Sequence, residues 1–68
     1  MLHEKINEDQ LYKEDETADF LSGSVATLRN DRHLGRGLAY VKLGRAVRYR
    51  GRDILEYIEA NRVECEAK

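Results

Sequence analysis

The sequence predicts a small α+β domain that is mainly helical, and three observations support this fold class. Two short helical stretches, at about residues 14–21 and 25–33, lie on either side of a Ser-Gly-Ser turn. Residues 40–50 alternate between apolar and basic side chains, which is typical of a β-hairpin. An apolar stripe with helical spacing then predicts a last helix at about residues 52–62. With 68 residues, the chain has room for one such domain.

The first two helices are predicted from their ends as well as from their apolar spacing. Acidic residues at 14–16 suit the first turn of a helix, where the helix dipole favours negative charge. Gly23 supplies a permissive backbone for the turn, and Ser24 can cap the second helix with its hydroxyl. Leu28 is the core anchor of that helix, whereas Asp31 points partly towards the core and needs a cationic or backbone partner. Two short helices across a three-residue turn that contains glycine form the helix-turn-helix pattern.

The predicted hairpin has one apolar and one basic face. The apolar face carries Val41, Leu43, Val47 and Tyr49, and the basic face carries Lys42, Arg48 and Arg50. A three-residue loop over residues 44–46 preserves this division, because it pairs Leu43 with Val47 and Lys42 with Arg48. The same loop places Arg45 at the tip. We therefore predict a wing that is apolar towards the core and basic towards solvent.

The domain is predicted to span residues 11–62. Leu11 and Tyr12 enter the first helical stretch, and the last helix packs through Ile54, Tyr57 and Ile58. Residues 1–10 are polar and acidic, and we expect them to form a flexible tail. Residues 63–68 are expected to be a frayed C-terminus.

Charge is segregated along the chain, although the formal net charge is only −1. Residues 1–24 carry two lysines against seven acidic residues, and residues 53–68 carry two basic against five acidic residues. Residues 25–52 carry eight lysines and arginines against one aspartate. A basic middle between acidic ends attracts polyanions locally, and DNA affinity depends on local charge rather than on net charge. A solvated arginine-rich surface without a ligand is the alternative interpretation.

Several classes of function are excluded by composition. An enzyme is not expected, because no nucleophile–base pair, phosphate-binding loop or metal cluster appears. Cys65 is the single cysteine, so no intramolecular disulfide forms, which fits a reducing cytosol. His3 and His33 are too scattered to build a metal site with it. No signal peptide or membrane span is visible, and we expect neither a cofactor nor a small-molecule substrate nor a membrane partner.

Most of the chain, from about residue 11 to residue 62, resembles a known family. The resemblance is carried by five segments: Asp15–Leu21, Ser22–Ser24, Thr27–Arg29, Tyr40–Arg50 and Asp53–Ile58. Together they resemble the MerR-like winged helix-turn-helix domains of the AlpA and excisionase type. The sequence departs from that family at Lys13, where Ser or Thr is usual, and at Asp31 and Gly51. The long coiled coil of full MerR regulators is not expected after the domain.

The resemblance implies a small DNA-binding factor of a prophage or integrative element, located in the bacterial cytoplasm at the nucleoid. It implies a recognition helix in the major groove and a wing on the flanking minor groove or backbone. The role is either excisionase, in which the protein bends attachment-site DNA for an integrase, or transcriptional regulation of the element's genes. A more distant alternative is a protein-interaction module such as an antirepressor or antitoxin, with Leu55, Cys65 and the acidic helices as its surface.

The candidate DNA-binding residues lie in the second helix and in the hairpin. They are Ser24, Val25, Ala26, Thr27, Arg29, Asn30, Arg32, His33, Lys42, Arg45, Arg48 and Arg50. Arg29 and Asn30 are the best candidates for contacting base edges, since Arg pairs with guanine and Asn with adenine. Thr27 can instead cap the helix, His33 can be merely solvated, and Arg32 can contact phosphate or pair with Asp31.

The wing cations are expected to hold phosphates, with Arg45 entering a narrow minor groove. A monomer of this size contacts about one half-site, so we expect a homo-oligomer on double-stranded DNA or a second protein such as integrase. The acidic ends of one protomer could then lie against the basic face of its neighbour.

Overall fold

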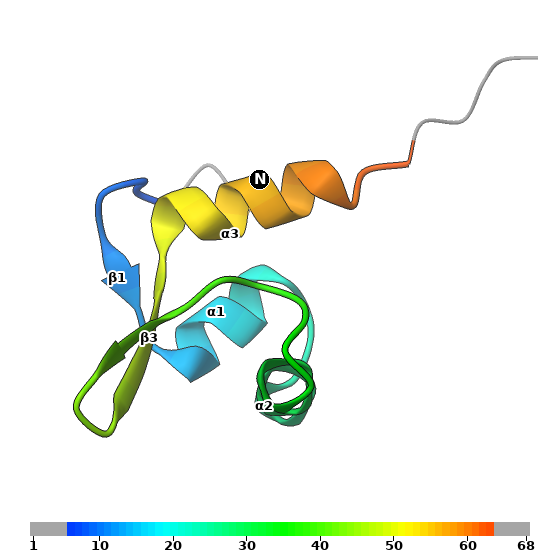
Figure 1. Cartoon of the computed structure of the whole chain (residues 1–68). Helices are drawn as coiled ribbons and strands as arrows, with labels where there is room; N and C mark the ends of the chain where they lie inside the picture. Colours follow the sequence, from blue (N-terminus) through cyan, green and yellow to red (C-terminus); the bar gives the residue numbers. More distant parts are fainter. Residues whose placement is uncertain (1–5, 64–68) are drawn as a thin grey trace, which may run out of the picture.

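The computed structural model describes residues 6–63, which form three helices and a small sheet (Figure 1). In chain order the elements are β1 (Leu11–Tyr12), α1 (Glu14–Phe20), α2 (Val25–His33), β2 (Val41–Leu43), β3 (Ala46–Arg50) and α3 (Gly51–Ala60). The order helix, turn, helix, hairpin, helix confirms the predicted α+β winged helix-turn-helix. No helix within residues 6–63 has the length and apolar character that a membrane crossing requires.

The sheet has an extra strand that sequence analysis missed. Its order is β1-β3-β2, and β1 pairs antiparallel with β3 through Leu11 opposite Arg50 and Tyr12 opposite Tyr49. The prediction that Leu11 and Tyr12 enter a helix was therefore wrong. Tyr12 is buried, its ring meets the Phe20 ring edge-on at 5.0 Å, and its hydroxyl accepts a 2.7 Å hydrogen bond from the Asn7 amide. A two-residue strand carries no periodicity by which sequence could identify it.

Residues 6–10, which we had assigned to the flexible tail, pack against the start of α3. Ile6 lies in the hydrophobic core with 7% of its surface exposed. The amides of Gly51 and Arg52 donate to the carbonyl oxygens of Gln10 and Glu8, at 2.8 and 3.1 Å. A Cβ atom at Gly51 would lie 1.9 Å from the Asn7 carbonyl oxygen, so this close crossing requires glycine. The rest of the predicted tail, residues 1–5, and residues 64–68 lie outside the described residues.

The core lies between the sheet and the three helices. It contains Leu28, the predicted anchor of α2, together with Leu38 from the following loop, Tyr49 from β3 and Ile54 from α3. Tyr57 and Ile58 are half-buried and pack against this cluster, as the apolar stripe predicted. Leu55 also packs against it, although the protein-interaction alternative had placed this residue on the surface.

The helices α1 and α2 end with the same backbone motif. After α1, the amides of Gly23 and Ser22 donate to the carbonyls of Ala18 and Asp19, at 2.9 and 3.1 Å. After α2, the amides of Arg36 and Gly35 donate to the carbonyls of Asp31 and Arg32, at 2.9 and 3.1 Å. This is the Schellman arrangement, which needs a left-handed residue after the helix. Gly35 adopts it with φ 72°, but Ser22 does so with φ 55°, whereas sequence analysis had assigned the permissive position to Gly23.

Asp31 finds its partner in the same motif. Its Oδ1 accepts from Arg36 Nε at 3.2 Å, and a Cβ atom at Gly37 would lie 3.0 Å from the Asp31 Cβ, so the loop leaves little space beside this side chain. The expected cationic partner is therefore Arg36 and not Arg32. Because Arg36 follows the turn directly, the pair ties the loop back onto α2.

The hairpin register differs from the prediction. β2 and β3 pair Leu43 with Ala46, Lys42 with Val47 and Val41 with Arg48, which leaves a two-residue turn at Gly44 and Arg45. Gly44 has φ 65° and Arg45 has a negative φ, the pattern of a type II′ turn, which suits the natural twist of a hairpin. The predicted three-residue loop was wrong, because this turn geometry outweighed the apolar alternation.

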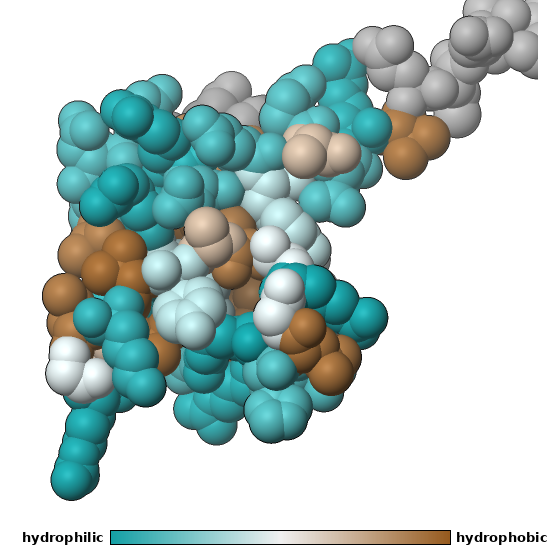
Figure 2. Space-filling model, viewed as in Figure 1, coloured by the Kyte–Doolittle hydropathy of each residue, from teal (hydrophilic) through white to brown (hydrophobic). Residues whose placement is uncertain are grey.

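The register changes which side chains share a face. Residues directly opposite one another in an antiparallel pair lie on the same face, so Lys42 lies with Val47 and Leu43 lies with Ala46. Leu43 is 52% exposed, and the surface over the sheet is visibly hydrophobic in Figure 2. The predicted apolar face holds for Val47 and for the buried Tyr49. It is wrong for Val41 and Leu43, which share a face with Arg48, and the predicted basic face is wrong for Lys42.

Candidate nucleic-acid interface

The second helix and the hairpin turn both lie on the side of α1 that faces away from α3 (Figure 1). A shallow groove separates them, with a volume of about 430 Å³. Its lining comes from the start of α1, from α2 and from the hairpin: Lys13, Glu14, Asp15, Val25, Arg29, Arg45, Ala46, Val47 and Arg48. The structure therefore brings together four of the predicted residues, Val25, Arg29, Arg45 and Arg48, and adds Lys13 as a fifth side chain of interest.

The hydroxyls at the start of α2 are engaged in capping. Ser24 Oγ accepts from the Thr27 amide at 3.1 Å, which confirms the predicted N-cap. The two hydroxyls also share a hydrogen bond of 3.0 Å. Ser24 and Thr27 line a different, apolar groove, formed with α1 and the end of α3. Capping therefore accounts for Thr27, the alternative that sequence analysis had kept open.

Three other predicted residues of α2 are exposed to solvent. Ala26, Asn30 and His33 all lie on the outside of the helix. The side chains of Asn30 and His33 form no hydrogen bond or ion pair with residues 6–63. This outer face is available to a partner, as a recognition helix requires.

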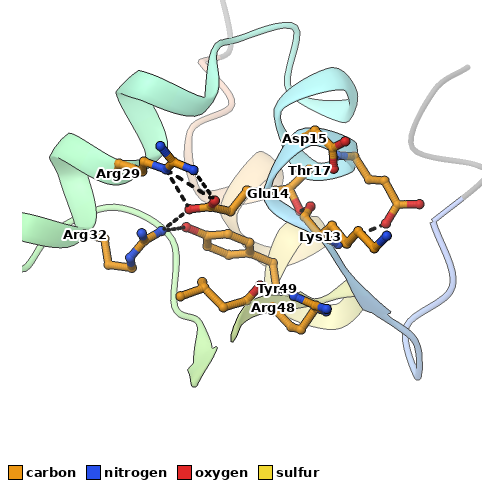
Figure 3. A network of polar contacts seen from close by, with 10 residues as sticks. Lys13, Glu14, Asp15, Thr17, Arg29, Arg32, Arg48 and Tyr49 are labelled. Carbon is orange, nitrogen blue, oxygen red and sulfur yellow. Dashed lines mark hydrogen bonds and ion pairs between the residues drawn. The ribbon is translucent and has the colours of Figure 1, made fainter. Parts of the chain in front are cut away.

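The two arginines of α2 share a single carboxylate (Figure 3). Glu14 Oε1 accepts from Arg29 Nη2 at 3.0 Å and from Arg29 Nε at 3.3 Å. Glu14 Oε2 lies 2.9 Å from Arg32 Nη1. The hydrogen bonds from Arg29, and then those from Arg32, hold the pKa of the Glu14 carboxyl below its ordinary value, although partial burial opposes them. The same contact with Glu14 raises the pKa of Arg29.

Arg32 points inward rather than towards a ligand. Its side chain is 19% exposed, and its Nη1 donates to the hydroxyl of the buried Tyr49 at 2.8 Å. Its guanidinium also lies over the Tyr40 ring, 5.5 Å from the centroid. Burial lowers the pKa of Arg32, but the hydrogen bonds with Tyr49 and Glu14 together raise it above its ordinary value. Arg32 thus joins α1, α2 and β3, and we no longer count it among the candidate DNA contacts.

Sequence analysis missed Glu14 because its partners are distant in the chain. Arg29 lies 15 positions after it, so local spacing gives no indication of the pair. The available signal was indirect: two arginines three positions apart on one helix need a shared acceptor when that face meets another element.

The wing cations separate into two groups. Arg45 is exposed at the turn, and Arg48 is half-buried with its Nη1 donating to the Val47 carbonyl at 2.9 Å. Lys42 is exposed on β2 and Arg50 is exposed where β3 passes into α3. Neither Lys42 nor Arg50 lines the groove. Arg45 and Arg48 are therefore the hairpin cations that line the groove beside α2.

Residues 11–62 match the protein family described as "Helix-turn-helix domain". The match covers most of the chain and the same range that sequence analysis assigned to the domain. No curated protein and no solved structure matches the chain significantly. The family match supports sequence-specific DNA binding and agrees with the resemblance to small proteins of the AlpA and excisionase type.

Proposed function

The chain belongs to the helix-turn-helix domain family, and from this premise we propose that it acts as an excisionase, a DNA-binding factor that directs an integrase. The observation that carries the DNA-binding part is the groove between α2 and the hairpin. Its lining includes four cations, Lys13, Arg29, Arg45 and Arg48, beside the two acidic residues Glu14 and Asp15. A helix with an exposed outer face beside a cationic wing suits a duplex, because bases and backbone can be contacted together.

In the proposed complex α2 enters the major groove. Arg29 and Asn30 contact base edges, Ala26 and His33 lie on the exposed outer surface, and Val25 lines the groove. Arg45 and Arg48 approach the flanking backbone or minor groove, and Lys13 adds a cation from the start of α1. Lys42 and Arg50 do not line the groove and would contact phosphate only where the DNA curves around the wing.

The proposed role is architectural rather than catalytic. One copy contacts about one half-site, so several copies or an integrase must share the attachment DNA. The exposed acidic residues of α3, Glu56 and Glu59, could face the basic groove of a neighbouring copy. Such a protein would act at the nucleoid, in the bacterial cytoplasm.

DNA binding is tested by selecting duplexes from a random pool and titrating salt. Four to six phosphate contacts give a slope of log K against log salt of roughly −4 to −5. Absence of salt-sensitive binding to any selected duplex would reject the DNA-binding proposal and favour a protein-interaction module. Footprinting over the attachment region and the promoters of the same element then separates the two roles. Protection of the attachment sites, with stimulation of integrase-dependent excision, supports an excisionase, and protection of promoters alone indicates a transcriptional regulator.

A further inference from the structure

One carboxylate, that of Glu14 in α1, pairs with two arginines of the proposed recognition helix. Its side chain is 19% exposed, whereas that of Arg29 is 64% exposed. One side of the Arg29 guanidinium is therefore bound to Glu14, and the rest of the guanidinium is open to solvent. An exposed arginine on a DNA-binding helix attracts phosphate without an ion pair of its own. The ion pair with Glu14 instead constrains the direction of the Arg29 side chain.

The donors of Arg29 are divided by this contact. A guanidinium has five N–H donors in a rigid plane, with one edge formed by Nε and one Nη, and the other formed by the two Nη atoms. Glu14 takes Nε and Nη2, which is the first edge. The second edge, Nη1 with the outer hydrogen of Nη2, forms no hydrogen bond with any residue from 6 to 63. That free edge has the two parallel donors that guanine O6 and N7 accept.

Glu14 is itself held from the other side. Arg32 Nη1 lies 2.9 Å from Glu14 Oε2 and donates to Tyr49 Oη at 2.8 Å, and Tyr49 is 1% exposed. The Glu14 carboxylate therefore has a position set by a buried residue of β3 (Figure 3). The hydrogen bonds with Glu14 therefore constrain the direction of Arg29 relative to the fold.

We propose that Glu14 is a specificity-determining positioning residue, which holds Arg29 by one edge so that the opposite edge is presented to a single guanine. The proposal rests on the DNA-binding function proposed above. A held arginine loses less conformational entropy on binding a base than a free one does. A carboxylate beside the DNA also repels phosphate, which disfavours sites where no guanine meets the free edge.

The test uses the duplex that the parent chain selects from a random pool. Each guanine in turn is replaced by 7-deazaguanine, which lacks the N7 acceptor. The parent is expected to lose about tenfold in affinity at one guanine. In Glu14→Gln that loss should shrink to threefold or less, while affinity for an unrelated duplex is unchanged or increased. The matched control is Asp19→Asn, which removes an exposed carboxylate of α1 that contacts neither arginine and should keep the tenfold loss.

Arg29→Lys keeps the test decisive if Glu14→Gln fails to fold, and a double variant extends the test if it folds. Arg29→Lys changes an exposed residue and keeps the charge, but it cannot donate two parallel bonds, so it should also lose the guanine effect. The double variant Glu14→Gln with Arg29→Ala should show the same loss of affinity with 7-deazaguanine as Arg29→Ala alone, because Glu14 acts through Arg29. Full discrimination in a folded Glu14→Gln, or in Arg29→Lys, overturns this inference while DNA binding stands. Failure of the parent to select any duplex overturns the proposed function as well.

Discussion

The helices α1 and α2 end with the same backbone motif, but different types of residue adopt the left-handed conformation in it. Both α1 and α2 close with a Schellman motif, but the left-handed residue is Gly35 after α2 and Ser22 after α1. A residue with a Cβ atom is strained in that conformation by roughly 1–2 kcal/mol. The turn of the helix-turn-helix therefore contains a local strain that composition did not indicate.

Replacing Ser22 by glycine should stabilise the protein. Relief of the left-handed strain exceeds the additional chain entropy of glycine, and we expect a gain of about 0.5–1 kcal/mol in the free energy of unfolding. Urea unfolding should show a higher midpoint with an unchanged m value. Gly35→Ala at the equivalent position of α2 should have the opposite effect, a loss of about 1 kcal/mol. A lower midpoint for Ser22→Gly would contradict this account of the turn.

Gly51 is required for a different reason, which is space. A methyl group there would overlap the Asn7 carbonyl oxygen, so Gly51→Ala should displace residues 6–10 from the start of α3 and cost about 1–3 kcal/mol. Gly23→Ala is the matched control, because its nearest neighbour would be 4.0 Å away. Thermal unfolding of both variants measures the difference. Equal melting temperatures would show that residues 6–10 do not stabilise the fold.

At the scale of the element, ion pairs join α1 to α2. The pKa of Glu14 is lowered in the folded state, mainly by the hydrogen bonds from Arg29. Its contribution to stability is therefore fully present above the unfolded value of 4.5 and is lost as the pH falls through the lower folded value.

Glu14→Gln should consequently destabilise the protein most at neutral pH. The difference in unfolding free energy between the parent and this variant should narrow as the pH falls below the unfolded value. Urea unfolding at a series of pH values measures it, with Asp19→Asn as the control for removal of one negative charge. A difference that stays constant down to acid pH would indicate that the ion pairs with Arg29 and Arg32 do not act in solution.

The hairpin is the element on which phosphate binding should depend. Arg45→Ala removes the cation at the turn, and we expect weaker DNA binding with a salt slope reduced by about 1. Arg52→Ala removes an equal charge from α3, on the side of the domain away from the groove, and should leave the slope unchanged. Salt titrations of both variants on one selected duplex provide the comparison. Identical slopes would place the phosphate contacts elsewhere than the wing.

Sequence predicted the elements better than it predicted how they pair. Acidic first turns, the Ser24 cap and the Leu28 anchor are local signals, and α1, α2 and α3 follow them closely. The register of the hairpin depends on turn geometry at Gly44, which apolar alternation could not outweigh. The Glu14 contacts depend on packing of separate elements, so only the folded chain reveals which predicted cations face outward.

On the scale of the whole molecule, opposite sides differ in charge. The groove is lined by Lys13, Arg29, Arg45 and Arg48 against Glu14 and Asp15, whereas α3 on the other side exposes Glu56 and Glu59 against Arg52. The formal net charge of −1 therefore conceals an uneven distribution of charge between the two sides of the domain. Such a charge distribution would orient the protein as it approaches a polyanion, before any base is contacted.

The contacts of Arg32 with Glu14 and Tyr49 also determine the distance between α2 and the wing. They fix α2 against β3, so the distance between α2, the proposed base-contacting helix, and the wing is constant. The domain would therefore require a fixed spacing between the two segments of DNA that it contacts. One base pair inserted between the two contacted segments moves them apart by about 3.4 Å. Affinity should fall for that insertion and not for one outside the footprint. Arg32, which touches no base in this arrangement, would thereby determine the spacing of the sites that the protein accepts.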